Sequence, residues 1–373
     1  MPETNNWKFE LEQYIRQSEP TKTEKSKAWE TAIGLQDVDG LKTSEYLLET
    51  AKEHIEGKID IDVAQKRIQS YYEERADRED VSFDTMEADI VASRIAALLG
   101  EQTFQFSPAE WQTIHKRLFE GVFNHAGIIR TYNITKKEWV LKGATVLYAS
   151  AESIKPTLAY DFDMEKQFSY EGLSVAESIK HISKFTSGIW QIHPFCEGNT
   201  RATAVFIIKY LKTFGFRIGN DAFANHSWYF RNALVRANYN NLSAGINATT
   251  EYLELFFENL LLNKNHELKN RYLHIEYEKE IRNDIVQSAN QNISKCQNDT
   301  LNDTINCTLD ELAILQIVAD EPTITQRELA RKSGKSERTI KRKTVELQEK
   351  GYLRRLNGKR NGRWEILIKL PLK

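Results

Sequence analysis

Two helical segments joined by a short polar loop place the strongest constraint on how this chain can fold. Apolar residues recur at helical spacing over 175–192 and again over 200–214, which predicts two amphipathic helices. Pro194 ends the first helix and favours an extended conformation at His193. Gly198 relaxes the backbone just before the second helix begins. The loop therefore places its side chains between the end of one helix and the N-terminus of the next.

The residue types in this loop suit a metal-bound polyphosphate. The free N–H groups and the dipole of a helix N-terminus attract anions, and Arg201 in the first turn can hold phosphate oxygens in a planar fork. Glu197 offers hard oxygen ligands to Mg²⁺. His193 titrates near neutrality and can act as a general base. A lone His, Glu or Arg is more often structural, so these assignments depend on the residues occurring together.

The loop also resembles a family signature. Residues 193–201 read HPFCEGNTR and resemble the Fic signature His-Pro-Phe-x-Asp/Glu-Gly-Asn-x-Arg, with seven specified positions in common. The resemblance covers about residues 88–262. Fic enzymes mostly transfer AMP from ATP to a Tyr, Ser or Thr hydroxyl of another protein. The resemblance therefore implies a protein adenylyltransferase, a nucleotidyltransferase with ATP as substrate and Mg²⁺ as its metal.

The resemblance also implies individual roles. His193 matches the base that takes the hydroxyl proton, and Glu197 matches the magnesium ligand. Phe195 matches a buried anchor of the loop, and Cys196 stands at the variable position as a spacer. The nucleotide-binding residues implied are Pro194, Phe195, Glu197, Gly198, Asn199, Thr200, Arg201 and, in the adenine pocket, Tyr229.

One position departs from the family pattern. Many Fic enzymes have a second Arg three residues after the first, where this chain has Ala204. The clamp on the γ-phosphate is then weaker, or it is supplied from elsewhere by Arg231 or Arg236.

A hairpin is predicted upstream of the loop. Two β-rich runs within 136–149 flank Lys142-Gly143, and an isolated hairpin must lie on a larger body to be stable. Fic proteins carry a flap here whose edge pairs with an extended target segment. A plain scaffold role is the alternative.

A regulatory helix is a further hypothesis. Residues 38–57 predict a helix that ends at Gly57. Many Fic proteins carry a helix with Ser/Thr-x-x-x-Glu-Gly/Asn whose Glu blocks productive ATP binding. Glu56 and Gly57 resemble its end, although Lys52 stands at the Ser/Thr position. We hypothesise that Glu56 limits activity; the alternative is a glycine helix stop beside a solvated Glu.

The C-terminal part predicts a second kind of domain. Helices are expected over 308–319 and 325–332, and Ser336 caps a third helix that ends at Gly351, before two strands around a turn. This order resembles a winged helix-turn-helix domain, with its third helix in the major groove of duplex DNA and its wing on phosphates. The candidate DNA-binding residues are Arg338, Lys341, Arg342, Lys359 and Arg360. Winged helices also serve as protein-contact modules. Since single domains of this kind bind DNA weakly, a homodimer is expected.

The chain is therefore expected to be mainly α, with a helical Fic core, a β-hairpin flap and a C-terminal winged helix-turn-helix. The predicted regions are an N-terminal helical region over 1–85, a Fic catalytic domain with a trailing helix over 86–287, a polar linker over 288–307 and the winged helix over 308–373. The helices expected in addition lie at 62–72, 86–100, 108–122, 222–237, 250–262 and 267–287.

The charge distribution agrees with this division. The formal charge of the whole chain is −2, which excludes a uniformly basic nucleic-acid binder. Residues 308–373, however, hold 16 Lys and Arg against nine Asp and Glu, a formal charge of +7, and the remainder carries −9. An acidic body and a basic tail are thus joined in one chain.

Compartment and alternative functions complete the expectations. The three cysteines, Cys196, Cys296 and Cys307, form neither a disulfide framework nor a zinc pattern. The first residues lack the charged, apolar and small-residue regions that follow one another in a signal peptide, and no apolar run of about 18 residues occurs. A cytoplasmic protein without a membrane span is therefore expected. Two other functions stay open. One is a DNA-binding transcriptional regulator with a sensor-like or weakly active Fic domain, and the other is transfer of phosphate or phosphocholine on the same fold.

Overall fold

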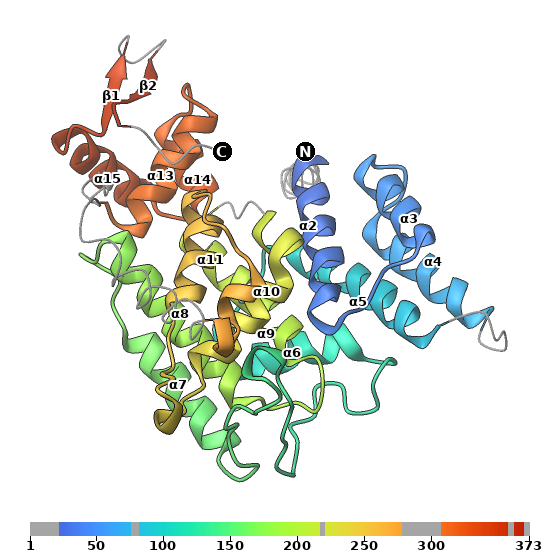
Figure 1. Ribbon diagram of the computed structural model, residues 1–373. Coiled ribbons are helices and arrows are strands. Elements are labelled where there is room, and N and C mark those ends of the chain that lie inside the picture. Colours follow the sequence, from blue (N-terminus) through green and yellow to red (C-terminus); the bar gives the residue numbers. More distant parts are fainter. Residues whose placement is uncertain (1–21, 76–81, 217–220, 278–306, 357–361, 369–373) are drawn as a thin grey trace, which may run out of the picture. The chain divides into compact units, whose positions relative to one another are not determined.

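The computed structural model describes residues 22–75, 82–216, 221–277, 307–356 and 362–368. They form two compact units, one of residues up to 127 together with 223–227, the other of 128–222 and the residues from 228 onward. The described chain is mainly helical with one two-stranded antiparallel sheet, which confirms the predicted class (Figure 1). None of the helices in the described ranges is long and apolar enough to cross a membrane.

The first unit is organised around α5 (Phe83–Gly100), which is buried around most of its circumference and packs against α2, α3, α4 and α6. The remaining helical elements of this unit are α2 (Lys22–Gly34), η1 (Leu35–Asp39), α3 (Glu45–Ile55), α4 (Ile61–Glu73) and α6 (Pro108–Phe119). The start of α6 follows the sequence prediction, because Ser107 Oγ accepts from Glu110 N and Pro108 occupies the first helical position.

A buried carboxylate joins three helices of this unit. Asp89 of α5 accepts hydrogen bonds from the backbone N of Ser44 at 2.8 Å, from the Ser44 hydroxyl, and from the Tyr72 hydroxyl at 2.6 Å. Burial raises the pKa of Asp89, and these donors offset part of that rise. The beginning of α3 and the end of α4 are thereby fixed to α5.

The second unit is centred on α9 (Asn199–Thr213), in which every residue from Asn199 to Leu211 is buried. Helix α8 packs against α7, α9 and α11. The other helical elements of this unit before the C-terminal residues are η2 (Trp139–Leu141), α7 (Ile154–Gln167), α8 (Val175–Ile192), η3 (Leu242–Ala244), α11 (Glu251–Leu262) and η4 (Asn270–Leu273). Helix α10 (Asp221–Ala237) is kinked at His226, and its part from Trp228 belongs to this unit.

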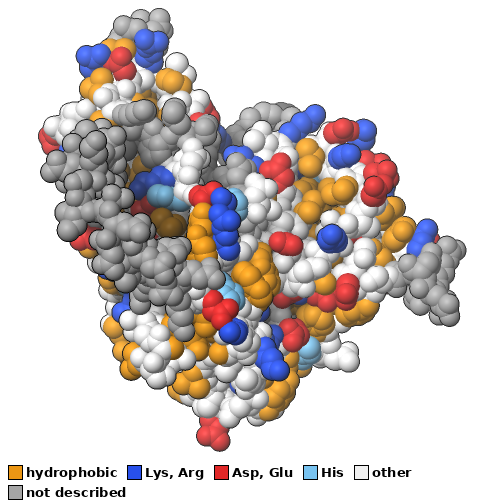
Figure 2. All heavy atoms as spheres, in the orientation of Figure 1, with side chains coloured by type: hydrophobic (Ala, Val, Ile, Leu, Met, Phe, Trp, Pro, Cys, Tyr) orange, Lys and Arg blue, Asp and Glu red, His pale blue; other side chains and the backbone are white. Residues whose placement is uncertain are grey.

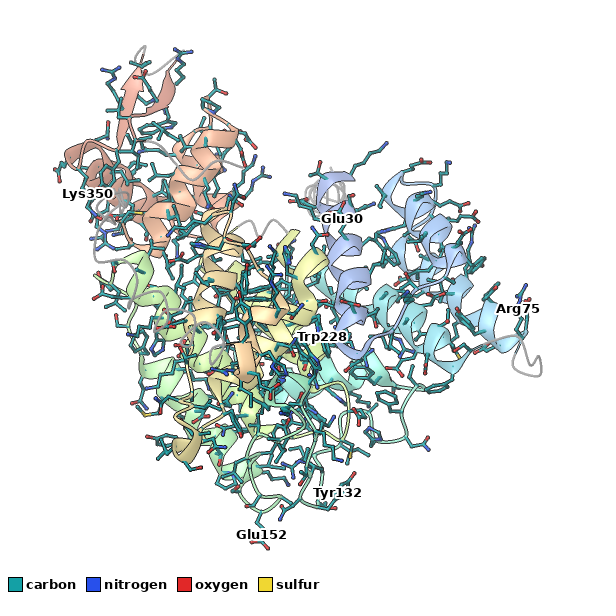
Figure 3. The ribbon with its side chains drawn as sticks, viewed as in Figure 1. Glu30, Arg75, Tyr132, Glu152, Trp228 and Lys350 are labelled. Carbon is teal, nitrogen blue, oxygen red and sulfur yellow. The ribbon has the colours of Figure 1, made fainter. Side chains whose placement is uncertain are left out.

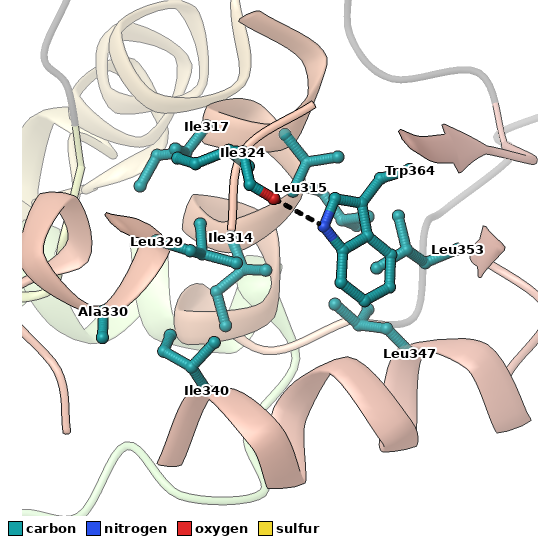
Figure 4. Close-up of a cluster of buried hydrophobic side chains, with 11 residues drawn as sticks. Ile314, Leu315, Ile317, Ile324, Leu329, Ala330, Ile340, Leu347, Leu353 and Trp364 are labelled. Atoms are coloured by element: carbon teal, nitrogen blue, oxygen red, sulfur yellow. Dashed lines mark hydrogen bonds between the residues drawn. The ribbon is translucent and has the colours of Figure 1, made fainter. Parts of the chain in front are cut away.

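The C-terminal residues form the predicted order of three helices and a wing. These elements are α13 (Leu309–Asp320), α14 (Gln326–Ser333), α15 (Glu337–Glu349), β1 (Leu353–Leu356) and β2 (Arg363–Ile366). The two strands are antiparallel, with Leu353 opposite Ile366. Trp364 anchors the wing in the small core, because its indole N–H donates to the Ile324 carbonyl at 3.0 Å (Figure 4). Ile340, Thr344 and Leu347 of α15 are buried.

Several elements differ from the sequence prediction. Residues 22–34 form a helix for which no separate range was predicted, and the predicted helix over 38–57 begins only at Glu45, after a left-handed Gly40. Helix α7 was not expected, because its exposed Tyr160 and Met164 obscure the apolar stripe. The helix predicted over 267–287 does not begin at 267, because residues 267–269 are not helical and residues 270–273 form η4. Helical residues follow only at 275–277, and the rest lies outside the described residues.

Candidate active site

The loop 193–198 joins the end of α8 to the beginning of α9. Helix α8 starts at Ser174 with a capping box to Glu177 and ends at His193. His193 does not adopt the extended conformation that Pro194 was expected to favour; it is left-handed, with φ 50° and ψ 58°. In this conformation the His193 N–H still bonds to the Trp190 carbonyl at 3.1 Å. A left-handed conformation costs a non-glycine residue about 1–2 kcal/mol, so the surroundings must hold it in place.

The His193 ring is enclosed. The side chain is 3% exposed, and its ring centroid lies 4.3 Å from that of Tyr148 and 5.3 Å from that of Trp190. Neither ring nitrogen has a hydrogen-bond partner among the described residues. Burial holds the pKa of His193 well below 6.5. The positive charges of Lys136, Arg130 and Arg231 lower this pKa further, and the Trp190 carbonyl offsets only part of the decrease. The imidazole is therefore neutral at physiological pH and can accept a proton.

Asn199 shapes the loop from inside. Its side-chain oxygen accepts from Phe195 N at 3.0 Å, and its side-chain nitrogen donates to Phe195 O at 2.8 Å. Phe195 is buried, as the resemblance implies for an anchor. Thr200 is also engaged, because its hydroxyl accepts from the Trp190 indole at 3.0 Å. Both side chains are therefore used within the protein, which leaves the backbone of the turn to face a ligand.

The N-terminus of α9 retains the properties of an anion site. Gly198 precedes the helix in a left-handed conformation, with φ 75°, and no side chain in the described residues caps the helix there. A helix N-terminus without a side-chain cap is a favourable place for an anion. Arg201 lies in the first turn and is 1% exposed. Arg201 is thus a buried residue of the first turn of α9, and its contact with phosphate oxygens stays a prediction.

Glu197 is the exposed acidic residue of the loop. Its carboxylate, 56% exposed, accepts from Lys136 Nζ at 2.9 Å. No cluster of three or more His, Cys, Asp or Glu that could hold a metal occurs in the described ranges. One accessible carboxylate fits a Mg²⁺ ion that arrives with a nucleotide, because Mg²⁺ usually takes one or two carboxylates together with phosphates and waters.

The segment upstream of the loop, residues 131–150, is called the flap segment here. Two arms without helix or strand flank η2, and Lys142 and Gly143 are left-handed, with φ 54° and 84°. The predicted turn at Lys142-Gly143 is confirmed, but no β-ladder joins the arms. Glu138 N donates to Ala144 O at 2.9 Å. Lys136 N donates instead to the Thr145 side chain, and Ala149 O accepts from the Arg130 side chain, so the two arms do not pair as β-strands. Figure 3 labels Tyr132 near the start of the flap segment.

A buried ion pair holds the flap segment against α10. Glu138, 1% exposed, accepts from Arg231 Nη1 at 2.7 Å and from the Tyr148 hydroxyl at 3.2 Å. Arg231, one of the two candidates for the role of the missing second Arg, is thus committed to Glu138. The other candidate, Arg236, is buried in α10, as is the predicted adenine-pocket residue Tyr229. Burial raises the pKa of the Tyr229 hydroxyl.

Glu56 lies in the first unit, at the C-terminal cap of α3. Its side chain is 52% exposed and pairs with Lys58 at 2.6 Å, which lowers the pKa of Glu56. On the face shown in Figure 2, acidic and basic side chains are interspersed over this unit, so no region of a single charge sign stands out there. An inhibitory role of Glu56 stays a prediction.

The basic residues predicted to contact DNA are partly described. Arg338, Lys341 and Arg342 are exposed on α15, while Lys359 and Arg360 lie outside the described residues. Other basic side chains of this domain are used internally. Lys343 and Lys350 lie 3.7 Å and 2.8 Å from the carboxylate of Glu311, which is 1% exposed.

Comparison with known proteins places both parts of the chain. Residues 105–211 match the model of the Fic/DOC family, and residues 311–354 match the model of a winged helix-turn-helix DNA-binding domain. The chain therefore contains a Fic domain and a C-terminal winged helix, which confirms the resemblance that the sequence carries. Domains of the Fic family are typically transferases, and AMP transfer is their typical reaction.

Among solved structures, the chain is similar to the N-terminal Fic domain of a Bartonella effector protein (Bep) from Bartonella sp. AR 15-3. The identity is 19%, the alignment covers 54% of this chain and 81% of that chain, and the TM-score is 0.34. No curated protein matches the chain.

Proposed function

We propose that this Fic-domain chain is a protein adenylyltransferase, which transfers AMP from ATP to a Tyr, Ser or Thr hydroxyl of a target protein or of the chain itself. The main support is a buried imidazole, His193, which is neutral at physiological pH and lies at the end of α8 close in sequence to the uncapped N-terminus of α9. A base and an anion site in one loop are what this transfer requires.

The proposed step has a simple balance. The target hydroxyl oxygen attacks the α-phosphorus of ATP while the bond from that phosphorus to the pyrophosphate oxygen breaks. A ring nitrogen of His193 takes the hydroxyl proton, and pyrophosphate leaves. Because the pKa of His193 is held low, the imidazole is free to accept this proton at neutral pH.

The remaining loop residues are proposed to bind and orient the nucleotide. The first-turn N–H groups of α9 and Arg201 would bind phosphate oxygens, and Asn199 would keep the turn in shape through Phe195. Tyr229 is proposed to line the adenine pocket. Glu197 would hold Mg²⁺, which when bound neutralises charge on the phosphates.

The test uses two labels in parallel. Full-length protein is incubated with a cell lysate and either α-³²P-ATP or γ-³²P-ATP. Protein labelled by the α-phosphate alone is expected, and the label should disappear in His193→Ala. Protein labelled from the γ-position alone would mean phosphate transfer and would refute the proposal. Absence of protein label from both nucleotides would favour the sensor-like alternative or a different donor such as one that supplies phosphocholine.

The inhibitory hypothesis is tested with the same assay. If Glu56 restricts ATP binding, Glu56→Gly should incorporate more AMP than wild type. Glu49 is exposed on the same helix, and Glu49→Ala should leave incorporation unchanged. Equal incorporation by wild type and Glu56→Gly counts against an inhibitory Glu56.

DNA binding is the second function that we propose, and the exposed basic residues of α15 support it. Duplex DNA should be retarded in a gel shift, and the affinity should fall as salt rises, because contacts to phosphates release counterions. Arg338→Ala should weaken binding, whereas Lys66→Ala on the exposed face of α4 should not. Binding by two copies is expected, and the protein is proposed to be cytoplasmic. No retardation of any duplex at low salt would leave the winged helix as a protein-contact module.

A further inference from the structure

We infer that Arg130 is a positioning residue for the proposed reaction, because it holds the loop 193–198 and the flap segment in fixed positions relative to each other. This inference rests on the proposed function. Neither the family signature nor the sequence pattern assigns a role to Arg130. Its bonds join the last carbonyls of α8 to both ends of the flap segment.

The guanidinium is bonded on all sides. Nε donates to the His193 carbonyl at 2.8 Å, and Nη2 donates to the Ile192 carbonyl at 3.3 Å. Nη1 donates to the Tyr132 carbonyl at 2.6 Å, and Nη2 also donates to the Ala149 carbonyl at 2.6 Å. The Arg130 residue is 3% exposed. A planar fork of N–H donors can serve four carbonyls at once, which the ammonium of a Lys cannot do in the same geometry.

The backbone of Arg130 adds a fifth bond. Its N–H donates to the Pro194 carbonyl at 2.8 Å. Arg130 therefore contacts three consecutive carbonyls, those of residues 192–194, at the turn where the chain leaves α8. A cation at a helix C-terminus is favourable, because the unsatisfied carbonyls there carry partial negative charge. Burial lowers the pKa of Arg130, but a guanidinium stays charged in proteins.

These bonds bear on the reacting group. His193 is held in a left-handed conformation that a non-glycine residue adopts only when its surroundings fix it. Arg130 binds the carbonyl of that same residue. Without this bond, the backbone at His193 could relax, and the imidazole would turn away from its present place.

The same guanidinium sets the flap segment against the imidazole. Tyr148 lies on the His193 ring, and the next residue, Ala149, is the one whose carbonyl Arg130 binds. The charged groups that face His193 are Lys136 of the flap segment, Arg130, and Arg231 of α10, and each favours the neutral imidazole. Loss of Arg130 should therefore move His193 and also raise its pKa.

The experiment compares Arg130→Ala and Arg130→Lys with wild type. We expect kcat for AMP transfer to fall about 100-fold in Arg130→Ala, the size of effect that a misplacement of roughly 1 Å produces, with little change in KM for ATP. Arg130→Lys should stay close to Arg130→Ala. Guanidinium ion at millimolar concentration should restore part of the kcat of Arg130→Ala and none of that of His193→Ala.

Arg94 provides a matched structural control. It also binds two backbone carbonyls, those of Leu118 at 3.0 Å and Glu120 at 2.6 Å, but it lies in the first unit. Arg94→Ala should lower the thermal midpoint and leave kcat and the acid limb of the pH profile of kcat/KM unchanged. If both variants change kcat and the pH profile equally, Arg130 is structural only and the inference is overturned.

A measurement on His193 itself separates this inference from the proposed function. The ring pKa is followed by NMR with isotope-labelled histidine, and His193→Gln identifies the resonance. The inference predicts a changed chemical shift and a higher pKa in Arg130→Ala. An unchanged shift and pKa would overturn it, whether or not the protein transfers AMP. If the pKa of His193 changes in Arg130→Ala but the wild-type protein transfers no AMP, the proposed function is refuted and the inference about Arg130 is not.

Discussion

The ion pair between Lys136 and Glu197 predicts a definite change in magnesium dependence. In the structure, Lys136 Nζ lies 2.9 Å from a carboxylate oxygen of Glu197, the residue that we propose as the Mg²⁺ ligand. The two side chains are 28% and 56% exposed, so the pair contributes only about 0.2–1 kcal/mol. Lys136→Ala removes this competitor, and a free energy of that size lowers the half-saturating Mg²⁺ concentration by at most about fivefold.

The measurement is a Mg²⁺ titration at fixed ATP, read both as AMP incorporation and as binding of a fluorescent ATP analogue. The matched control is Lys137→Ala, since Lys137 is exposed next to Lys136 and has no bond to Glu197 in the structure. An unchanged or higher half-saturating Mg²⁺ concentration in Lys136→Ala would refute the reasoning, as would an equal shift in the control.

Three further outcomes are expected. The pKa of folded His193 lies below 6.5, so its contribution to stability is complete above pH 6.5 and is lost as pH falls. The free energy of unfolding should then change by up to about 1.4 kcal/mol per pH unit. Denaturant unfolding between pH 5 and 7 should show a weaker dependence of that free energy on pH in His193→Gln. Asn199→Ala should lower stability by about 1–3 kcal/mol and also reduce AMP incorporation, because both bonds to buried Phe195 are lost; a stable but inactive variant would point to direct ligand contact instead. Trp364→Phe should cost about 0.5–1.5 kcal/mol through the lost bond to Ile324, seen as faster hydrogen exchange in α15, and unchanged exchange would contradict this.

The parts of the fold that follow from local rules could be predicted from the sequence. The bounds of α8 are the predicted ones, because its apolar stripe is regular, Ser174 caps its start and Pro194 prevents it from continuing. Ser107 with Pro108 marked the start of α6 for the same kind of reason. The loop at 193–201 was readable because its residues are close in sequence and each carries a familiar chemistry.

The features that could not be predicted depend on contacts between distant residues. Arg130 is 62 to 64 positions away from the carbonyls that it binds in α8 and the loop, and backbone carbonyls leave no signal in a sequence. The left-handed His193 follows from the same surroundings, since local rules favour an extended residue before Pro194. The flap segment was expected to pair as two strands, but the burial of Glu138 with Arg231 decides its course instead. The pattern of β-rich residues reports none of these contacts.

The charge of the winged helix illustrates the same limit on a different scale. A formal charge of +7 over residues 308–373 attracts a polyanion at long range whichever side chains carry it. Contacts with phosphates, however, need basic groups that are free to leave their present partners. Lys343 and Lys350 surround the buried Glu311 and hold the start of α13, so moving them onto DNA would leave that carboxylate uncompensated. Arg338 and Lys341 are exposed on α15 and face no such cost. Each phosphate contact contributes roughly −0.9 to the slope of the logarithm of the binding constant against the logarithm of the salt concentration. A measured salt slope therefore counts the exposed residues of α15 and the wing, and it should be well below what the net charge alone would suggest.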